Sequence, residues 1–445
     1  MKTIAWITLL AVGCTLTACG GTLGASQYTV GGTLTGLVGT GLVLENNSGD
    51  PLTLTSNGKF AFGAGMDNNG AYLVTVKSQP SNPAQICIVQ NGSGTIDNAN
   101  VTNVTVSCPQ TGHFAFVANV LSNNLSAYSI NSASGALTII SGSPFSARGT
   151  APAALALAPN GNFLYVVNSG SNNVSVFSIS AVTGALSGVG VPISTGSGPD
   201  AICIDPTGSY LYVANSSSNS VSAYTIDSAT GLLTELGNSP FMVGGAPSSL
   251  KTDSSGMFLY VTNFTDGDVS VLQIDSSTGS LSSIAGSPFK AGSGAIAIAI
   301  DSAGTFAYVA NETSATISEY SINSSTGALT AVPGSPVATQ SSPQSLAPDP
   351  AGGFIYAANV TSANNIATFA INSSTGALTL SGSPVSAGTL PISLTIDPSG
   401  QFAYVANDTS NNVSVYQIDT TTRALTQVSQ SPFAAGIGPH AIVID

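Results

Sequence analysis

The stretch "PISLTIDPSGQFAYVAN", residues 391–407, decides the fold because variants of it recur along the chain. Its final six letters return as FAFVAN, FLYVVN, YLYVAN, FLYVTN, FAYVAN and FIYAAN. Each copy ends in an asparagine, and successive asparagines lie 49, 47, 48, 48, 48 and 48 residues apart: Asn119, Asn168, Asn215, Asn263, Asn311, Asn359 and Asn407. The sequence therefore contains a repeat of 47–49 residues.

Each repeat holds four short apolar or alternating segments, separated by clusters of Gly, Pro, Asn, Asp and Ser. This pattern indicates antiparallel strands, and no window of useful length has a helical period. Four strands in about 48 residues predict one propeller blade, so the copies predict an all-β, seven-bladed β-propeller. The first unit, "HFAFVAN", lacks a preceding strand, and "PHAIVID" at 439–445 supplies one. We expect these two segments to pair, which closes the ring without a free sheet edge.

The repeat also resembles a known family. "YVTN" at 260–263 resembles the YVTN-type propeller repeats of bacterial and archaeal surface proteins. The longer unit, residues 391–426, resembles seven-bladed lactonase-like propellers, which include 6-phosphogluconolactonase-like and muconate-cyclising proteins. The resemblance covers residues 113–445 and implies a lactonase-like propeller domain over 109–445. Activity is a separate question, because one fold hosts many functions.

The amino-terminal segment does not belong to the repeat and is typical of an export signal. Residues 1–18 combine one Lys with a short apolar run, as in a removable signal peptide. "LTAC" at 16–19 resembles a bacterial lipobox, which implies lipidation of Cys19; a plain secretory signal cut nearby is the alternative. Acyl chains would then be the sole membrane attachment. Gly20 does not resemble the Asp that marks inner-membrane retention, so we expect a lipid-anchored protein in the cell envelope, at the outer membrane, periplasm or cell surface.

A second domain is expected between the signal and the propeller. Residues 19–27 read as a tether, and 28–108 as a small β-sandwich that resembles Ig-like or prealbumin-like modules. Cys87 and Cys108 lie 21 residues apart in an exported domain, which favours a disulfide. Cys203 has no partner left and is interpreted as a buried small hydrophobe.

Composition limits the partners. Charged residues are 6% of the chain, and seven basic residues oppose twenty acidic ones, for a net charge of −13. Without a basic stripe, nucleic acid is excluded as a partner. No G-x-S-x-G, H-E-x-x-H, Cys-x-x-Cys or phosphate loop occurs, so no cofactor or metal is expected. We expect a monomer whose partner is an unidentified ligand or protein.

Many acidic residues are interpreted as turn formers rather than catalysts. Asp side chains can hydrogen-bond the backbone two residues on and so start a turn. Nine of the twenty recur at two fixed repeat positions: Asp205, Asp253, Asp301, Asp349, Asp397 and Asp445, and Asp227, Asp275 and Asp419. The repeated asparagine is interpreted likewise, as a cap on the next loop.

The candidate site lies at one channel mouth, where inner strands begin. The starting residues are His440, Ala153, Asp200, Ser248, Ile296, Gln344 and Ile392, and the nearby loops add Arg148, Asp266, Asp268, Lys290, Glu312 and Asp408. His440 matches a position where lactonase-like propellers often carry His; with Asp200, Arg148 and Glu312 it could polarise a lactone carbonyl and activate water. A solvated rim His is the alternative. The His/Arg/Glu set of the muconate-cyclising relatives is not found.

Two further residues complete the prediction. His113 is expected at the opposite face, too far from His440 for a shared metal. Lys251 replaces a small inner-strand residue and either extends to solvent or contacts a ligand in the channel. Two functions remain: a surface-anchored binding or scaffold propeller, which the sparse rim favours, and a lactone hydrolase.

Overall fold

A computed structural model describes residues 27–37, 40–80, 87–108, 113–339, 341–361 and 363–445. The expected signal peptide, Cys19 and most of the tether lie outside these residues. The chain divides into two compact units, 1–111 and 112–445, which are described separately. Within the described residues, no helix is long and apolar enough to cross a membrane.

The first unit consists of two four-stranded sheets. One has the order β4 (Gly58–Ala61), β1 (Val30–Thr35), β8 (Val101–Ser107), β6 (Ile88–Gln90); the other has β3 (Asp50–Leu54), β2 (Leu42–Asn46), β5 (Ala71–Ser78), β7 (Ser93–Thr95). Buried side chains from both sheets, such as Leu44 and Val104, form one hydrophobic core. A disulfide joins Cys87 to Cys108. Two sheets on one core form a sandwich, while the Ig-like or prealbumin-like assignment stays a prediction.

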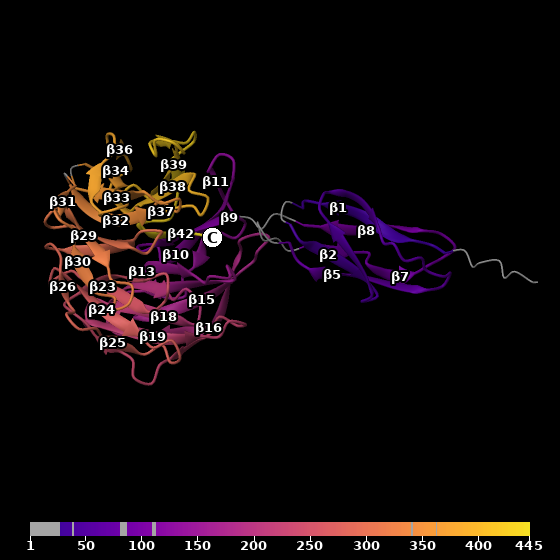
Figure 1. Cartoon of the computed structure of the whole chain (residues 1–445), viewed down its shortest axis with the longest axis horizontal. Coiled ribbons are helices and arrows are strands. Elements are labelled where there is room, and N and C mark those ends of the chain that lie inside the picture. The colour runs from indigo at the N-terminus through magenta and orange to yellow at the C-terminus, as the bar shows by residue number, and fades with distance from the viewer. Residues whose placement is uncertain (1–26, 38–39, 81–86, 109–112, 340, 362) are drawn as a thin grey trace, which may run out of the picture. The chain divides into compact units, whose positions relative to one another are not determined.

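The second unit contains seven antiparallel sheets, each built from an inner, a second, a third and an outer strand (Figure 1). The inner strands of blades 1 to 7 are β42 (Pro439–Ile444), β13 (Pro152–Leu157), β17 (Pro199–Ile204), β22 (Pro247–Thr252), β27 (Ala295–Ile300), β32 (Ser342–Pro348) and β37 (Pro391–Ile396). The second strands are β9 (His113–Asn119), β14 (Phe163–Asn168), β18 (Tyr210–Asn215), β23 (Phe258–Asn263), β28 (Phe306–Asn311), β33 (Phe354–Val360) and β38 (Phe402–Asn407).

The third strands are β10 (Asn124–Ile130), β15 (Asn173–Ile179), β19 (Ser220–Ile226), β24 (Asp268–Ile274), β29 (Thr316–Ile322), β34 (Asn365–Ile371) and β39 (Asn412–Ile418). The outer edge of blade 2 is one strand, β16 (Leu186–Ser194). In the other blades it is a pair of short strands: β11 (Leu137–Ile139) and β12 (Phe145–Ser146), β20 (Leu233–Glu235) and β21 (Phe241–Met242), β25 (Leu281–Ser283) and β26 (Phe289–Lys290), β30 (Leu329–Ala331) and β31 (Val337–Ala338), β35 (Leu378–Leu380) and β36 (Val385–Ser386), β40 (Leu425–Gln427) and β41 (Phe433–Ala434).

The carboxy-terminal strand closes the ring. β42 pairs antiparallel with β9, with Ala441 opposite Ala118 and Ile442 opposite Val117. Each inner strand also contacts the next inner strand around the cycle, and β42 contacts both β37 and β13. The expected seven-bladed architecture is therefore confirmed, with the first and last repeats sharing blade 1.

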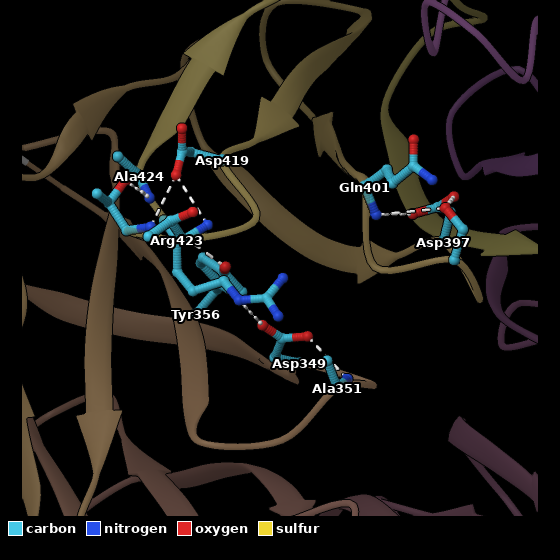
Figure 2. A network of polar contacts seen from close by, with 11 residues as sticks. Asp349, Ala351, Tyr356, Asp397, Gln401, Asp419, Arg423 and Ala424 are labelled. Carbon is cyan, nitrogen blue, oxygen red and sulfur yellow. Dashed lines mark hydrogen bonds and ion pairs between the residues drawn. The ribbon is translucent and has the colours of Figure 1, made fainter.

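The recurring Asp and Asn side chains hold the turns. Asp397 Oδ1 accepts a hydrogen bond from the backbone amide of Gln401 at 2.9 Å (Figure 2). It also accepts one from the amide of Phe402 at 2.8 Å. Asn263 is fully buried, and its Nδ2 donates to Asp268 Oδ1 at 2.8 Å and Ser270 Oγ at 2.9 Å. These asparagines thus tie the end of each second strand to the start of the third strand.

A tyrosine hydroxyl joins most neighbouring blades. Each Tyr donates to a backbone carbonyl in the outer turn of the next blade: Tyr165 to Gly231 at 3.0 Å, Tyr212 to Gly279 at 2.9 Å, Tyr260 to Gly327 at 3.1 Å, Tyr308 to Gly376 at 2.9 Å, Tyr356 to Arg423 at 3.4 Å and Tyr404 to Gly135 at 3.2 Å. Blade 1 carries Phe116 at this position, so the contact between blades 1 and 2 lacks the bond.

Arg423 adds an ion pair between blades 6 and 7. It stands where the other outer turns have glycine, with a positive φ of 58°. Its Nε lies 3.2 Å from Oδ2 of the buried Asp349, beside the Tyr356 hydroxyl (Figure 2). The side chain that replaces glycine therefore stabilises the contact through a charge on the preceding blade.

Candidate functional site

A β-bulge sets the direction of each residue that starts an inner strand. In blade 1, Pro439 pairs with Asn119 and Ala441 with Ala118, so His440 is the extra residue between them. The same shift places Ala153 between Pro152 and Ala154, and Asp200 between Pro199 and Ala201. A bulge disrupts the ladder locally and redirects the side chain, which is a common arrangement beside functional sites.

His440 lies beside a carboxylate from the neighbouring blade. Asp408 follows β38 of blade 7, and its amide donates to the carbonyl of Leu390 at 2.9 Å. His440 Nδ1 is 3.6 Å from Asp408 Oδ2, a distance that permits charge attraction but is too long for a good hydrogen bond. Nδ1 is itself buried, while the His440 side chain is 39% exposed. The accessible part of the imidazole is therefore the side that carries Nε2.

Asp200 completes a cluster drawn from three blades. Burial raises the pKa of the Asp200 carboxyl, and the nearby charge of His440 opposes that rise. Blade 2 lies between them and contributes Ala153, whose methyl group leaves room at the mouth. The structure therefore brings together His440, Asp200 and Asp408. A carboxyl with a raised pKa can donate a hydrogen bond when protonated and accept one when ionised.

Arg148 is not part of this cluster. Its guanidinium donates to the carbonyls of Val189 at 3.1 Å and Gly190 at 2.5 Å, on the outer strand β16. The six other blades have a Ser–Pro pair at this place, five of them with a cis bond, whereas blade 2 has Val191–Pro192. With its donors used in this way, Arg148 supports blade 2 rather than a ligand beside His440.

Glu312 occupies the position in blade 5 that Asp408 occupies in blade 7. Its amide donates to the carbonyl of Gly294 at 2.8 Å, and its side chain has no ion pair among the described residues. By the repeat, its neighbour at the start of the next inner strand is Gln344, as His440 is the neighbour of Asp408. Glu312 thus belongs to another part of the rim.

The remaining charged residues of the mouth loops are bound within their own blade. Asp266 Oδ2 accepts from the amide of Gly245 at 2.6 Å, and Lys290 Nζ lies 3.8 Å from Asp268 Oδ2. His113 Nδ1 lies 4.0 Å from Asp445 Oδ1, at the other end of blade 1. The described residues contain no group of three or more His, Cys, Asp or Glu that could hold a metal ion.

The pairing of Asp408 with His440 was not predicted from the sequence, although the repeat contains the signal. The residue after each repeated asparagine is Val120, Ser169, Ser216, Phe264, Glu312, Val360 or Asp408. Each of these residues follows or ends a second strand that contacts the inner strand of the next blade. Of the two acidic residues in this set, only Asp408 precedes the blade that carries a histidine.

Comparison with known proteins supports the architecture. The family described as lactonase, 7-bladed beta-propeller, matches residues 101–251 and 244–438. No curated protein matches the chain. A putative 6-phosphogluconolactonase from Bacteroides fragilis is 21% identical over 75% of this chain and 98% of its own, with a TM-score of 0.67.

Two further solved structures are similar. A putative 6-phosphogluconolactonase from Bacteroides uniformis is 20% identical over 76% of this chain and 100% of its own, with a TM-score of 0.66. The Pseudomonas aeruginosa periplasmic gluconolactonase is 21% identical over 75% of this chain and 98% of its own, with a TM-score of 0.64. At these identities the likeness shows the fold, whereas the family match spans most of the chain. The chain therefore belongs to the lactonase family of seven-bladed β-propellers.

Proposed function

We propose that the protein is a binding propeller of the cell envelope, attached to a membrane through lipid on Cys19. Its mouth takes a small, uncharged ligand rich in hydroxyl groups, between His440, Asp408 and Asp200. The observation that carries this proposal is the meeting of these three ionisable groups from blades 1, 7 and 3 on redirected strand ends. Carboxylates and an imidazole are suitable donors and acceptors for hydroxyl groups.

The charged and apolar side chains of the mouth support an uncharged ligand. Arg148 and Lys290 already contact protein groups, so neither offers a free cation for a phosphate. Leu121 and Ile437 lie next to His440 in blade 1, joined by a backbone hydrogen bond of 3.1 Å, and are 69% and 55% exposed. The mouth thus combines polar acceptors with an apolar edge, as ligand sites commonly do.

Lactone hydrolysis is the second candidate, and the His440–Asp408 pair favours it. With Asp408 beside Nδ1, the accessible Nε2 is the atom that would take a proton from water. The resulting hydroxide would attack the lactone carbonyl, the ring C–O bond would break, and the departing alkoxide would recover the proton to give a hydroxy acid. General-base assistance of this kind contributes about 10²- to 10⁴-fold. The absence of Arg148 from the cluster removes one means of polarising the carbonyl.

A paired binding and turnover experiment tests the proposal. Signal-free protein is titrated with glucono-1,5-lactone and with 1,5-anhydroglucitol, a cyclic ether that cannot be hydrolysed. We expect saturable binding of both and no lactone turnover above background. His440→Ala and Asp408→Asn should weaken binding, whereas Glu312→Gln, the matched change in blade 5, should leave it unchanged.

Three results would change the assignment. Turnover that disappears in His440→Ala would establish the hydrolase instead. Turnover that is unaffected by His440→Ala would place the site elsewhere, and failure of both compounds to bind would refute the proposed ligand class. The anchor is tested separately: Cys19→Ser should move the protein from the membrane to the soluble fraction, and an unmodified Cys19 by mass spectrometry would refute lipidation.

A further inference from the structure

The central channel has a second potential site at the end away from His440. A cavity of about 370 Å³ lies among the inner strands of blades 2, 3 and 4. It is lined by the second half of these strands and the turns that follow, including Leu155, Ala156, Ile202, Cys203, Leu250 and Lys251. Its volume is within the range of sites for small molecules, and its wall combines polar groups with apolar side chains.

Lys251 provides an unpartnered cation in this cavity. The propeller contains four basic residues other than histidine: Arg148, Lys251, Lys290 and Arg423. Three of them have a partner, because Arg148 contacts backbone carbonyls, Lys290 lies near Asp268 and Arg423 pairs with Asp349. The exposed Lys251 has no ion pair or hydrogen bond from its side chain among the described residues. In a protein with a net charge of −13, a free cation inside the channel is unusual.

The nearest carboxylate is engaged in its own turn. Asp205 also lines the cavity, but its Oδ1 accepts from the amides of Ser209 at 2.8 Å and Tyr210 at 2.6 Å. Its Oδ2 accepts from the amide of Thr207 at 3.0 Å. Burial raises the pKa of the Cys203 thiol to about 12, and the nearby positive charge of Lys251 opposes that rise. The ammonium therefore lies close to the apolar wall that Cys203 forms.

Some backbone N–H groups at the same level of the channel as Lys251 also lack a protein acceptor. In three blades, a serine of the preceding inner strand accepts from an amide at the channel edge: Ser249 from Ile298 at 3.5 Å, Ser345 from Leu394 at 3.1 Å and Ser393 from Ile442 at 3.2 Å. The equivalent amides of blades 2, 3 and 4 belong to Leu155, Ile202 and Leu250.

These three amides have no serine to receive them. The corresponding residues of the preceding blades are Ala441, Ala154 and Ala201, and no protein acceptor is found within the described residues. All three amides belong to residues that line the cavity with Lys251. A sheet edge with free N–H groups provides a concave site for an anion.

We propose that this cavity binds a small organic carboxylate, whose anionic group lies between Lys251 and the free edge amides of Leu155, Ile202 and Leu250. The apolar part of the ligand packs on Ala156, Cys203 and Ile204. A single ammonium with amide donors suits a monoanion, since charge-assisted hydrogen bonds supply the affinity. A phosphate dianion would require further cations. The proposal does not depend on the function assigned to the mouth around His440.

Calorimetric titration with benzoate tests this site, with benzamide as the uncharged probe of the same shape. We expect saturable binding of benzoate and none of benzamide. Lys251→Met keeps the length of the side chain without its charge and should weaken benzoate binding at least tenfold. Lys290→Met removes a lysine that already has a carboxylate partner and should change nothing. Ala201→Ser supplies the Leu250 amide with the hydroxyl that Ser249 gives Ile298, and should weaken binding severalfold.

Ala201→Ser and Lys290→Met are expected to fold because other blades carry these residues at the equivalent positions, Ser249 and Met242. If thermal unfolding shows that Lys251→Met is destabilised, Lys251→Thr is used in its place, because blade 7 has Thr395 at the equivalent position. Absence of benzoate binding, or equal affinity in both Lys251 variants and the natural protein, would overturn the proposal. Inorganic phosphate binding more tightly than benzoate would overturn the ligand class, and an unchanged affinity in Ala201→Ser would overturn the role of the amides.

Discussion

Phe116→Tyr should stabilise the propeller by completing the set of tyrosine bonds between blades. A Cβ placed on Gly231 would lie 2.4–2.7 Å from ring atoms of Phe163, where the Tyr165 hydroxyl reaches the Gly231 carbonyl. At the contact between blades 1 and 2, a Cβ on Gly184 would lie 2.4–2.8 Å from ring atoms of Phe114. The two contacts therefore have the same geometry, and a hydroxyl on Phe116 should reach the Gly184 carbonyl.

The sign of the change in stability tests this reasoning. A new hydrogen bond should raise the free energy of unfolding by about 0.5–1.5 kcal/mol, whereas a buried hydroxyl without an acceptor would lower it by about 1–3 kcal/mol. Tyr308→Phe is the reverse change and should lower stability by about 1 kcal/mol or more. Denaturant unfolding should be used to measure both changes in the free energy of unfolding. Thermal unfolding is less sensitive, because the melting temperature of a unit of this size shifts by only about 1–2 °C per kcal/mol. Destabilisation by Phe116→Tyr would refute the equivalence of the contacts.

Two further predictions concern blade 1. Removal of residues 438–445 exposes the edge of β9, so the truncated chain should aggregate; a monomer with an unchanged melting temperature would contradict closure by β42. Burial raises the pKa of the Asp445 carboxyl from 3.8 to about 6, so the folded protein binds the carboxyl proton more tightly than the unfolded chain does. Protonation of Asp445 therefore stabilises the fold fully below about pH 4, and this stabilisation is lost as the pH rises through 6. Asp445→Asn keeps an acceptor for the Phe114 amide and should stabilise the protein above pH 6, by at most about 3 kcal/mol, with no gain below pH 4; a gain independent of pH would contradict the assignment.

The fold could be predicted because the same pattern of strands and turns occurs seven times in the sequence. Every copy places a second strand before a buried asparagine, and six of the seven place an Asp after the first strand, with Ala158 there in blade 2. The closing strand was predictable for the same reason, since "PHAIVID" supplies what the first unit lacks. Periodicity and turn chemistry are local properties, so they can be read from the sequence alone.

The site could be predicted only in part, because its contacts join blades that are distant in the chain. The position of His440 at the mouth follows from the repeat, but its contact with Asp408 depends on which blade precedes which in the ring. Arg148 lies near the mouth in sequence, yet its side chain extends along blade 2, because that blade has no Ser–Pro turn. Position in the repeat predicts where along a blade a residue lies, whereas its rotamer and the neighbouring loop determine which groups its side chain contacts.

Departures from the repeat fall into two physical classes, and the difference bears on function. Arg423 and Glu319 replace the residue usual at their position, and Arg148 is an extra residue before the second blade. Each contacts a specific protein group, as when Glu319 Oε1 accepts from the amide of Leu378 at 2.6 Å. Such residues compensate for a local change and need no ligand to explain them. His440, Asp200 and Lys251 also depart from the repeat, but each keeps polar capacity that no protein hydrogen bond uses among the described residues. A polar group at a channel without a protein partner is hydrogen-bonded to water and can exchange that water for a ligand. The two ends of this channel are therefore where ligands should be sought, and the Asp-containing turns of the repeat are not.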